Sequence, residues 1–155
     1  MVDVGRTSRE KLSRAHHQMA CSRLDHIHKM TSAIASNYSV VCVEDLNTSG
    51  MVKNRRLAKS VSDAAFSEIR RQLQYKANTV VVIDRWFPST KLCPQCGQIN
   101  DMPLNKRVYS CDCGYGPICR DKNAAKNILL EGIRKGFPEF KPVENGALAQ
   151  AFVLE

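Results

Sequence analysis

The sequence lacks several features that would assign it to a common functional class. It has no run of 18 or more apolar residues and no charged and then apolar leader, so we expect neither a membrane span nor a secretory peptide, and we expect the cytosol. It also has no Gly-rich phosphate loop and no Gly-x-Ser-x-Gly nucleophile elbow, so nucleophilic hydrolase chemistry is not supported. No internal repeat is found.

The cysteines are the most informative residues that are present. The chain has 155 residues, of which 43% are apolar, enough for one ordinary domain with a metal-stapled insertion. In a reducing compartment, tight cysteine pairs indicate metal rather than disulfides. Two such pairs occur, Cys93-Pro-Gln-Cys96 and Cys111-Asp-Cys113. Four thiolates suit a tetrahedral zinc site, which can hold together a ribbon too small to fold on its own core.

The second pair is one residue shorter than the common spacing. Residues two apart in an extended segment face the same side, so Cys111 and Cys113 can still converge on one ion, with Cys119 as the alternative fourth ligand. Gly97 permits the tight turn that points backbone amides at the sulfurs. A closed shell of four thiolates leaves no position for water, so the zinc is expected to be structural.

The formal charge of +8 is concentrated in one stretch. Between Met51 and Lys91, nine basic residues stand against three acidic ones, an excess of six. Such a surface suits a phosphate backbone, although a solvated, solubilising face gives the same pattern. The candidate nucleic-acid contacts are Lys53, Arg55, Arg56, Lys59, Arg70 and Arg71.

Hydrophobic periodicity predicts an α/β fold. We expect helices over Arg9–Asn37, Ser60–Ala77 and Asp121–Lys135, and buried strands over Ser39–Val43 and Val80–Ile83. A strand, a helix and a strand joined by so long a connection indicate a parallel pair. A turn is expected at Thr48 to Gly50, followed by a basic loop, and the segment 136–155 shows no periodicity and is expected to be a flexible tail.

Two carboxylates are candidates for chemistry. Glu44 follows the first strand directly, where ligand sites lie in parallel sheets, and Asp121 opens the last helix. Singly, Glu44 suits a solvated strand end and Asp121 a helix N-cap. Together they can hold Mg²⁺, which prefers carboxylate oxygens. Trp86 and Phe87 leave two alternatives open: packing at the sheet edge, which is favoured, or stacking on bases.

Five motifs, taken in order, resemble the C-terminal half of the OrfB/TnpB family, transposon-encoded RNA-guided nucleases related to type V CRISPR effectors. The resemblance spans residues 9 to 135. The motifs are Val43-Glu44-Asp45-Leu46-Asn47, Ser49-Gly50-Met51-Val52-Lys53-Asn54, Asp84-Arg85-Trp86-Phe87-Pro88-Ser89, Cys93-Pro94-x-Cys96-Gly97 and Arg120-Asp121-x-Asn123-Ala124-Ala125.

The resemblance implies an incomplete RNase H-like (RuvC-type) fold with an inserted zinc ribbon. It divides the chain into a helical segment (1–38), a partial nuclease domain (39–90 and 115–135), a zinc ribbon (91–114) and a flexible tail (136–155). It also implies that Glu44 and Asp121 are the second and third catalytic carboxylates, that both hold Mg²⁺, and that DNA and a guide RNA are partners.

The sequence departs from the family pattern at the first catalytic aspartate. Asp3-Val4-Gly5 fits the spelling of that motif, but no buried apolar run precedes it, and Cys119 replaces an aspartate of the family. We therefore expect a truncated, zinc-binding and nucleic-acid-binding protein that is catalytically incomplete by itself. The alternative is half of a Mg²⁺-dependent endonuclease completed in trans by an N-terminal fragment. Either way, the edge of strand Ser39–Val43 is expected to be open.

Overall fold

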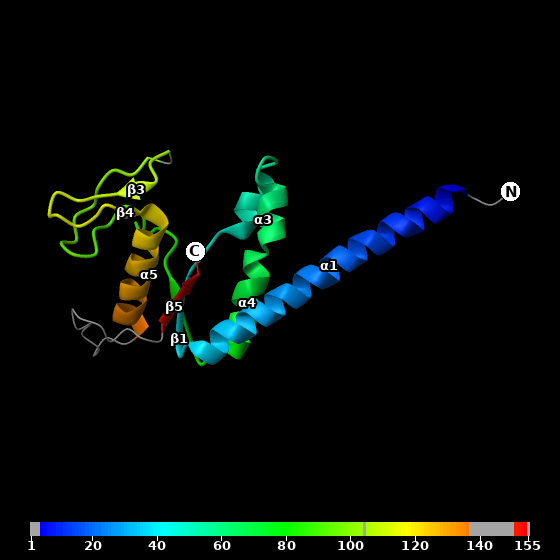
Figure 1. The fold of residues 1–155 in the computed structure, drawn as a ribbon, viewed down its shortest axis with the longest axis horizontal. Helices are drawn as coiled ribbons and strands as arrows, with labels where there is room; N and C mark the ends of the chain where they lie inside the picture. The colour runs from blue at the N-terminus through cyan, green and yellow to red at the C-terminus, as the bar shows by residue number, and fades with distance from the viewer. Residues whose placement is uncertain (1–3, 104, 137–150, 155) are drawn as a thin grey trace.

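The chain alternates helices with short strands. Our structure, a computed structural model, describes residues 4–103, 105–136 and 151–154 (Figure 1). The helices are α1 (Val4–Asn37), α2 (Thr48–Lys53), α3 (Ala58–Ala64), α4 (Phe66–Lys76) and α5 (Arg120–Gly136). The strands are β1 (Val40–Glu44), β2 (Thr79–Ile83), β3 (Val108–Tyr109), β4 (Ile118–Cys119) and β5 (Ala151–Leu154).

A small parallel sheet forms the centre of the fold. Its strand order is β2-β1-β5, and β1 pairs with β2 in the register Val40↔Thr79 through Glu44↔Ile83. The predicted parallel strand-helix-strand unit is therefore confirmed. Strand β2 lies at the edge of the sheet. Val80 and Val82 pack on the cluster shared with α1 and α4, and Val81 and Ile83 on the cluster shared with α5, so both faces are covered as predicted, although only Ile83 is fully buried.

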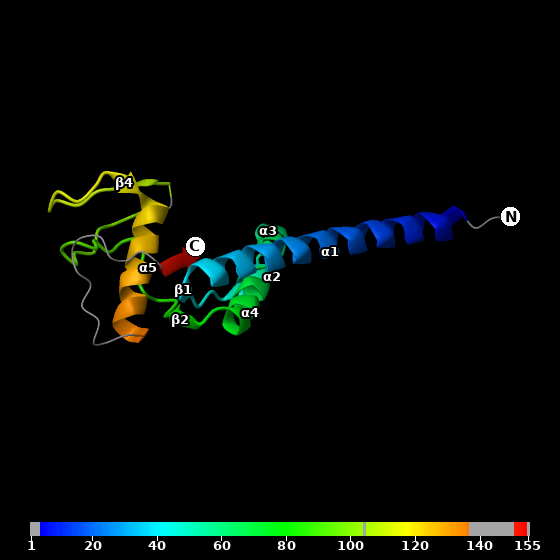
Figure 2. The ribbon, with the colours of Figure 1, turned by 60° about the horizontal axis from the view of Figure 1, so that its bottom comes forward.

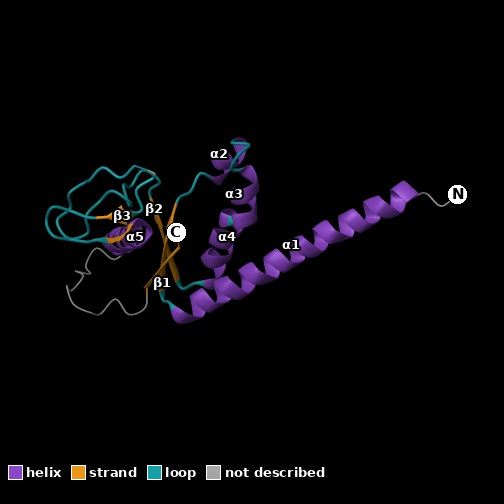
Figure 3. Ribbon diagram, turned by 45° about the horizontal axis from the view of Figure 1, so that its top comes forward, coloured by secondary structure: helices purple, strands orange, loops and turns teal. Residues whose placement is uncertain are grey.

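The central strand is buried on both faces, as its unbroken apolar run predicts. Val41 packs against Ile34 of α1 and Leu73 of α4, and on the opposite face Cys42 packs against Ile128 of α5. Figures 1 and 3 show the sheet between α5 on one side and the pair α1 and α4 on the other. The sheet therefore presents its carboxyl end, where Glu44 stands, between two helical layers.

Close approach of α5 to the sheet depends on a glycine. A Cβ at Gly132 would overlap the sulfur of Cys42, so this position accepts no larger side chain without movement of the helix or the strand. Cys42 is fully buried, and burial raises the pKa of its thiol to about 11. It is an inert core residue, as predicted.

Two local predictions between the strands are wrong. The expected helix over Ser60–Ala77 is divided into α3 and α4 at Ala65, whose φ of 52° places it in the left-handed region. The expected turn at Thr48–Gly50 is the start of α2. Its cap is Asn47, whose side-chain oxygen accepts a hydrogen bond from the backbone amide of Gly50 at 3.0 Å. An Asn cap satisfies a free amide of the first turn, which stabilises even a short helix.

The first helix packs against the rest of the protein only near its end. Ile27 and Ile34 are buried, whereas Leu12 and Met19, earlier in the same helix, are each 60% exposed. Figure 2 shows the N-terminal part of α1 extending away from the other elements, and Arg23 of α1 forms an ion pair with Asp63 of α3 at 2.7 Å. Within the described residues, no helix is both long and apolar enough to cross a membrane.

A buried polar network joins α1 to α4. Thr31 donates to the side-chain oxygen of Gln72 at 2.8 Å, and both residues are fully buried. Lys76 Nζ lies 2.8 Å from Thr31 Oγ1 and 3.1 Å from Nδ1 of His28. Lys76 therefore fixes the packing of two helices, and His28 is one of its partners.

The end of the chain forms a strand where a flexible tail was expected. Strand β5 pairs in parallel with β1, from Val40↔Ala151 to Val43↔Leu154. It covers the edge of β1 that the sequence predicts to be open. The sequence of this segment indicates a strand only by a run of four apolar residues. The strand forms because the backbone groups at the edge of β1 need hydrogen-bond partners.

Candidate metal centre and strand-end site

The four predicted cysteines come together. The sulfur atoms of Cys93, Cys96, Cys111 and Cys113 all lie within 4.8 Å of one another, and the closest pairs, Cys93 with Cys113 and Cys96 with Cys111, are 3.6 Å apart. Cys119 is exposed and lies outside this group. The geometry therefore selects Cys113 rather than Cys119 and is compatible with zinc.

Backbone amides prepare the sulfurs for a cation. The amide of Cys113, followed by the Asn100 side chain, lowers the pKa of the Cys111 thiol to about 6. The Tyr115 amide favours the Cys113 thiolate in the same way, but burial and the three neighbouring cysteines outweigh it and raise the pKa of Cys113 to about 12. Gly97, with φ of +76°, forms the turn after the first pair, as predicted. Four thiolates this close repel one another, so a divalent cation is what lets all four ionise.

The segment around the cysteines has a very small core of its own. This cysteine segment (residues 91–103 and 105–119) contains only the two-residue strands β3 and β4. Its buried cluster consists of Met102 and Tyr109 together with Cys93 and Cys111. Burial raises the pKa of Tyr109 to about 12, and its hydroxyl accepts a hydrogen bond from Asn100 at 2.9 Å. So little apolar contact is typical of a segment that depends on a metal to fold.

Two buried asparagines attach the cysteine segment to α5. The side-chain amides of Asn123 and Asn127 donate to the carbonyl of Leu92 at 3.0 and 2.8 Å, and Asn127 also donates to the carbonyl of Ser89 at 2.7 Å. The exposed fractions of the two asparagines are 0% and 1%. No role was predicted for Asn127. It lies one helical turn after Asn123, however, and this spacing places both polar side chains on the same buried face of α5.

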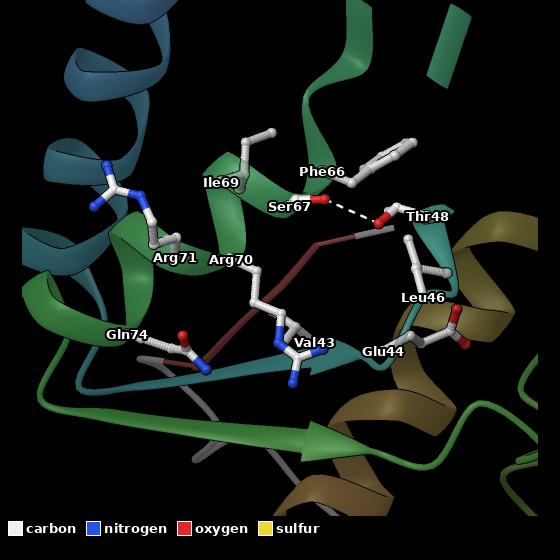
Figure 4. Close-up of a pocket in the computed structure, with 10 residues that line it drawn as sticks. All are labelled: Val43, Glu44, Leu46, Thr48, Phe66, Ser67, Ile69, Arg70, Arg71 and Gln74. Carbon is white, nitrogen blue, oxygen red and sulfur yellow. Dashed lines mark hydrogen bonds between the residues drawn. The ribbon is translucent and has the colours of Figure 1, made fainter. Parts of the chain in front are cut away.

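The loop after β2 that Asn127 binds also fixes the side chain of Glu44. Ser89 is buried, and its hydroxyl donates to Oε1 of Glu44 at 2.7 Å. Glu44 is half-buried at the end of β1, and Figure 4 shows its carboxylate turned away from Arg70. This role of Ser89 could not be predicted from the sequence, because only the tertiary structure brings the end of β1 next to the residues that follow β2.

Asp121 is the second residue of α5 and is therefore not its N-cap. It is exposed, and Arg120 Nε lies 3.4 Å from its Oδ1. A carboxylate in the first turn is favoured by the helix dipole. Apart from the four cysteines, the described residues contain no group of three or more His, Cys, Asp or Glu side chains that could share a metal ion. Glu44 and Asp121 are therefore not members of a larger cluster of metal-ligating side chains among the described residues.

Two of the six predicted nucleic-acid contacts form ion pairs inside the protein. Asp45 accepts hydrogen bonds from Arg85 and from Arg70, the latter at 2.6 Å, and these bonds lower the pKa of the Asp45 carboxyl, with Arg85 the larger cause. Arg71 binds Glu68 with two hydrogen bonds of 2.7 and 2.8 Å, which are the main cause of the lowering of the Glu68 pKa to about 2. The charge of both arginines is thus partly balanced within the fold.

The other four predicted contacts lie on α2, on α3 and on the turn between them. All are exposed, and none forms an ion pair with another described residue; they are Lys53, Arg55, Arg56 and Lys59. Exposed Met51, Val52 and Leu57 lie in the same segment. This segment therefore offers unbalanced positive charge to the surroundings.

A cavity of about 200 Å³ lies between β1, α2 and α4 (Figure 4). Phe66 and Ile69 supply apolar lining, and Thr48 and Ser67 are joined by a hydrogen bond of 2.9 Å at its wall. Glu44 is among the lining residues, whereas its hydrogen-bond partner Ser89 is not, so the cavity adjoins the strand-end site at Glu44.

The two aromatic residues after β2 behave differently. Phe87 packs against the buried cluster of Cys42 and Ile83, as favoured by the sequence analysis. Trp86 is 85% exposed, so the favoured alternative of packing is wrong for this residue.

These features define an α/β protein with a parallel sheet, a carboxylate fixed at a strand end and a four-cysteine cluster suited to a metal ion. Comparison with protein families matches residues 4–55 to a probable transposase model, OrfB_IS605, and residues 66–128 to the Cas12f1-like TNB domain. The chain belongs to the OrfB/TnpB family of transposon-encoded proteins.

Curated relatives agree with this assignment. A "Putative RNA-guided DNA endonuclease" of Streptomyces pristinaespiralis is 43% identical over 131 residues, which cover 81% of this chain and 32% of the relative. The "Putative RNA-guided DNA endonuclease InsQ" of Escherichia coli K12 is 30% identical over 144 residues, which cover 80% of this chain and 36% of the relative. The "TnpB-like protein L79" of Acanthamoeba polyphaga mimivirus is 28% identical over 138 residues, which cover 81% of this chain and 26% of the relative. The chain thus spans about a third of the length of these relatives.

Proposed function

We propose that this chain is a zinc-stabilised, nucleic-acid-binding part of a TnpB-type RNA-guided DNA endonuclease. In this proposal the sheet and its helices are part of an RNase H-like (RuvC-type) domain, and the cysteine segment is its inserted zinc ribbon. The observation that carries the proposal is the hydrogen bond from Ser89 to Glu44. It fixes a carboxylate at the carboxyl end of a parallel strand, which is where such sheets place their ligands.

Glu44 and Asp121 are the proposed Mg²⁺ ligands. Carboxylate oxygens are the ligands that this cation prefers, and bound Mg²⁺ would polarise a phosphodiester and favour ionisation of a water molecule. Asp121 belongs to α5, which packs on β1 and is fixed to the Ser89 segment through Asn127. Two carboxylates are few for a two-metal site, so we expect binding without cleavage by this chain alone.

A second possibility is completion in trans, in which another polypeptide brings a third carboxylate to the end of the sheet. The lack of a third acidic partner among the described residues favours this reading over cleavage by the chain alone. Guide RNA and target DNA are the proposed partners, and the names of the relatives, RNA-guided DNA endonucleases, support both.

The exposed basic segment supports phosphate contacts. The first test is a titration of labelled single-stranded DNA and RNA at several salt concentrations. We expect affinity to fall with salt, and we expect the double variant Arg55→Ala/Arg56→Ala to lower the slope of log affinity against log salt by about 2. The matched control is Arg134→Ala/Lys135→Ala at the far end of α5, which should keep the slope. Absence of salt-dependent binding would contradict the proposed function.

The second test measures cleavage. The purified zinc-loaded chain with Mg²⁺ and DNA should bind without cutting, and addition of guide RNA and a family N-terminal fragment carrying a strand-end aspartate should restore cutting. Glu44→Gln should abolish the restored activity, because it removes one charge of the Mg²⁺ site, whereas Asp101→Asn on the exposed surface of the cysteine segment should not. Cleavage by the chain alone would overturn the expectation that its site is incomplete.

A further inference from the structure

Trp86 is the most exposed large apolar residue of the protein among those described. It is the only tryptophan in the sequence, and 85% of its surface is open to solvent. Tryptophan is highly buried on average in folded proteins, and exposed aromatic surface often marks a binding site. The neighbouring Phe87 does pack into the core, so the loop does not lack an available apolar cluster.

The backbone around Trp86 is held on both sides. Its amide donates to Oδ1 of Asp84 at 2.8 Å, and the amide of Phe87 donates to the carbonyl of Asp84 at 3.0 Å. The amide of Ser89 in turn donates to the carbonyl of Phe87 at 2.8 Å. The indole therefore projects from a fixed turn, which lowers the entropy cost of using it as a contact surface.

This turn lies at the same end of the sheet as Glu44. Strand β2 ends at Ile83, which pairs in register with Glu44, and Trp86 follows three residues later. Ser89, in the same loop, donates to Glu44. Arg85, adjacent to Trp86, keeps 41% of its side chain exposed while it pairs with Asp45. An aromatic face and a guanidinium thus belong to the loop that leaves the sheet at the end where the candidate carboxylate lies.

We propose that Trp86 is a stacking platform for an unpaired nucleobase of a single strand that crosses the carboxyl end of the sheet. This inference rests on the proposed function. Every base has a π face, so an indole binds bases of any type, and nearby cations bind the phosphates. The excess of six positive charges between Met51 and Lys91 favours a nucleic acid over an apolar protein surface as the occupant.

The single tryptophan makes the inference directly measurable. The zinc-loaded chain is titrated with oligothymidylate of about 15 nucleotides, enough for one site of this class, while tryptophan fluorescence is recorded. Stacking should quench the emission in step with binding measured by anisotropy of a labelled oligonucleotide. An abasic oligonucleotide of the same length should bind through its phosphates without the same quenching.

Variants test whether the contact contributes to affinity. Trp86→Ala should weaken binding by about 5- to 150-fold, the range for loss of one base–aromatic stack. Trp86→Phe should retain most of the affinity. The matched control is Tyr75→Ala, which removes an aromatic side chain that is 55% exposed near the opposite end of β2 and should leave affinity unchanged. Far-UV circular dichroism checks that each variant folds.

The outcomes separate this inference from the function on which it rests. Binding with unchanged fluorescence, equal quenching by the abasic strand, or equal affinity of Trp86→Ala would overturn the stacking role and leave nucleic-acid binding intact. Fluorescence that responds to an N-terminal family fragment but not to DNA would make Trp86 a protein contact instead and would also overturn it. Absence of any binding would contradict the proposed function itself.

Discussion

Asn127 should be the more important of the two asparagines that attach the cysteine segment to α5. It makes hydrogen bonds to the carbonyls of Ser89 and Leu92 at 2.7 and 2.8 Å, whereas Asn123 makes one, at 3.0 Å to Leu92. If Asn127 is replaced by alanine, Leu92 keeps the bond from Asn123. The carbonyl of Ser89 loses its side-chain donor in a buried environment.

The expected magnitude follows from these bonds. A buried hydrogen bond contributes about 1 kcal/mol, and a buried carbonyl left without a donor costs about 1–3 kcal/mol. The side-chain oxygens of both asparagines have no hydrogen-bond partner among the described residues, so truncation also removes an unpaired acceptor and offsets part of the loss. We expect Asn127→Ala to lower the free energy of unfolding by about 2–3 kcal/mol and Asn123→Ala by about 1 kcal/mol or less.

The assay is urea unfolding of the zinc-loaded protein, followed by far-UV circular dichroism. The double variant gives the coupling between the two asparagines, which share the Leu92 acceptor and should therefore not be additive. An equal or larger loss for Asn123→Ala would refute the reasoning, because it would mean that the bond to Ser89 contributes nothing. The same variants can be tested for altered carbon-13 chemical shift of the Glu44 carboxylate, which Ser89 orients.

Three other changes test the metal centre, the helix–sheet contact and the acid stability. Cys96→Ser, or removal of zinc with a chelator, should abolish hydrogen-exchange protection in the cysteine segment. The control Cys119→Ser should keep both the protection and one bound zinc per chain. A melting curve unchanged by the chelator, with no bound zinc in the unmodified protein, would contradict the assignment. Gly132→Ala should destabilise the protein by about 1–3 kcal/mol, the usual cost of overpacking, because its Cβ would overlap the sulfur of Cys42, and equal stability in urea would show that α5 can move freely. The folded-state pKa of Glu68, about 2, lies below the ordinary 4.5, so its ion pair stabilises the fold above about pH 4.5 and loses this effect as the pH falls toward 2. The difference in unfolding free energy between the unmodified protein and Glu68→Gln should therefore shrink over that range. A constant difference would contradict this prediction.

The elements with strong periodicity were predictable, and those that depend on distant contacts were not. The unbroken apolar run before Glu44 predicted a strand covered on both faces, because successive side chains of a strand point to opposite faces and here all of them are apolar. The left-handed conformation of Ala65 could not be predicted from the sequence, because alanine favours a continuous helix. Strand β5 was missed for a related reason, because its pairing with β1 satisfies an edge more than a hundred residues earlier.

The candidate sites divide in the same way. The cysteine spacing predicted the four ligands, but the choice between Cys113 and Cys119 required the distances between sulfur atoms. The basic stretch was predicted as one surface. The structure divides it into exposed side chains, as on α2 and α3, and paired ones such as Arg70 and Arg71. The packing of α4 brings Arg70 to Asp45 after β1, whereas Arg71 pairs with Glu68 within α4 itself.

The sequence by itself determined the two close cysteine pairs, the parallel strand pair, the family and the two candidate carboxylates, because these depend on local spacing and composition. Only the tertiary structure decided how they are connected. The Leu92 carbonyl, two buried asparagines and the Ser89 hydroxyl link the cysteine segment to Glu44, and Trp86 is left open beside them. Hydrogen bonds of this kind require groups from separate segments to meet within about 3 Å, and sequence spacing alone does not fix such distances.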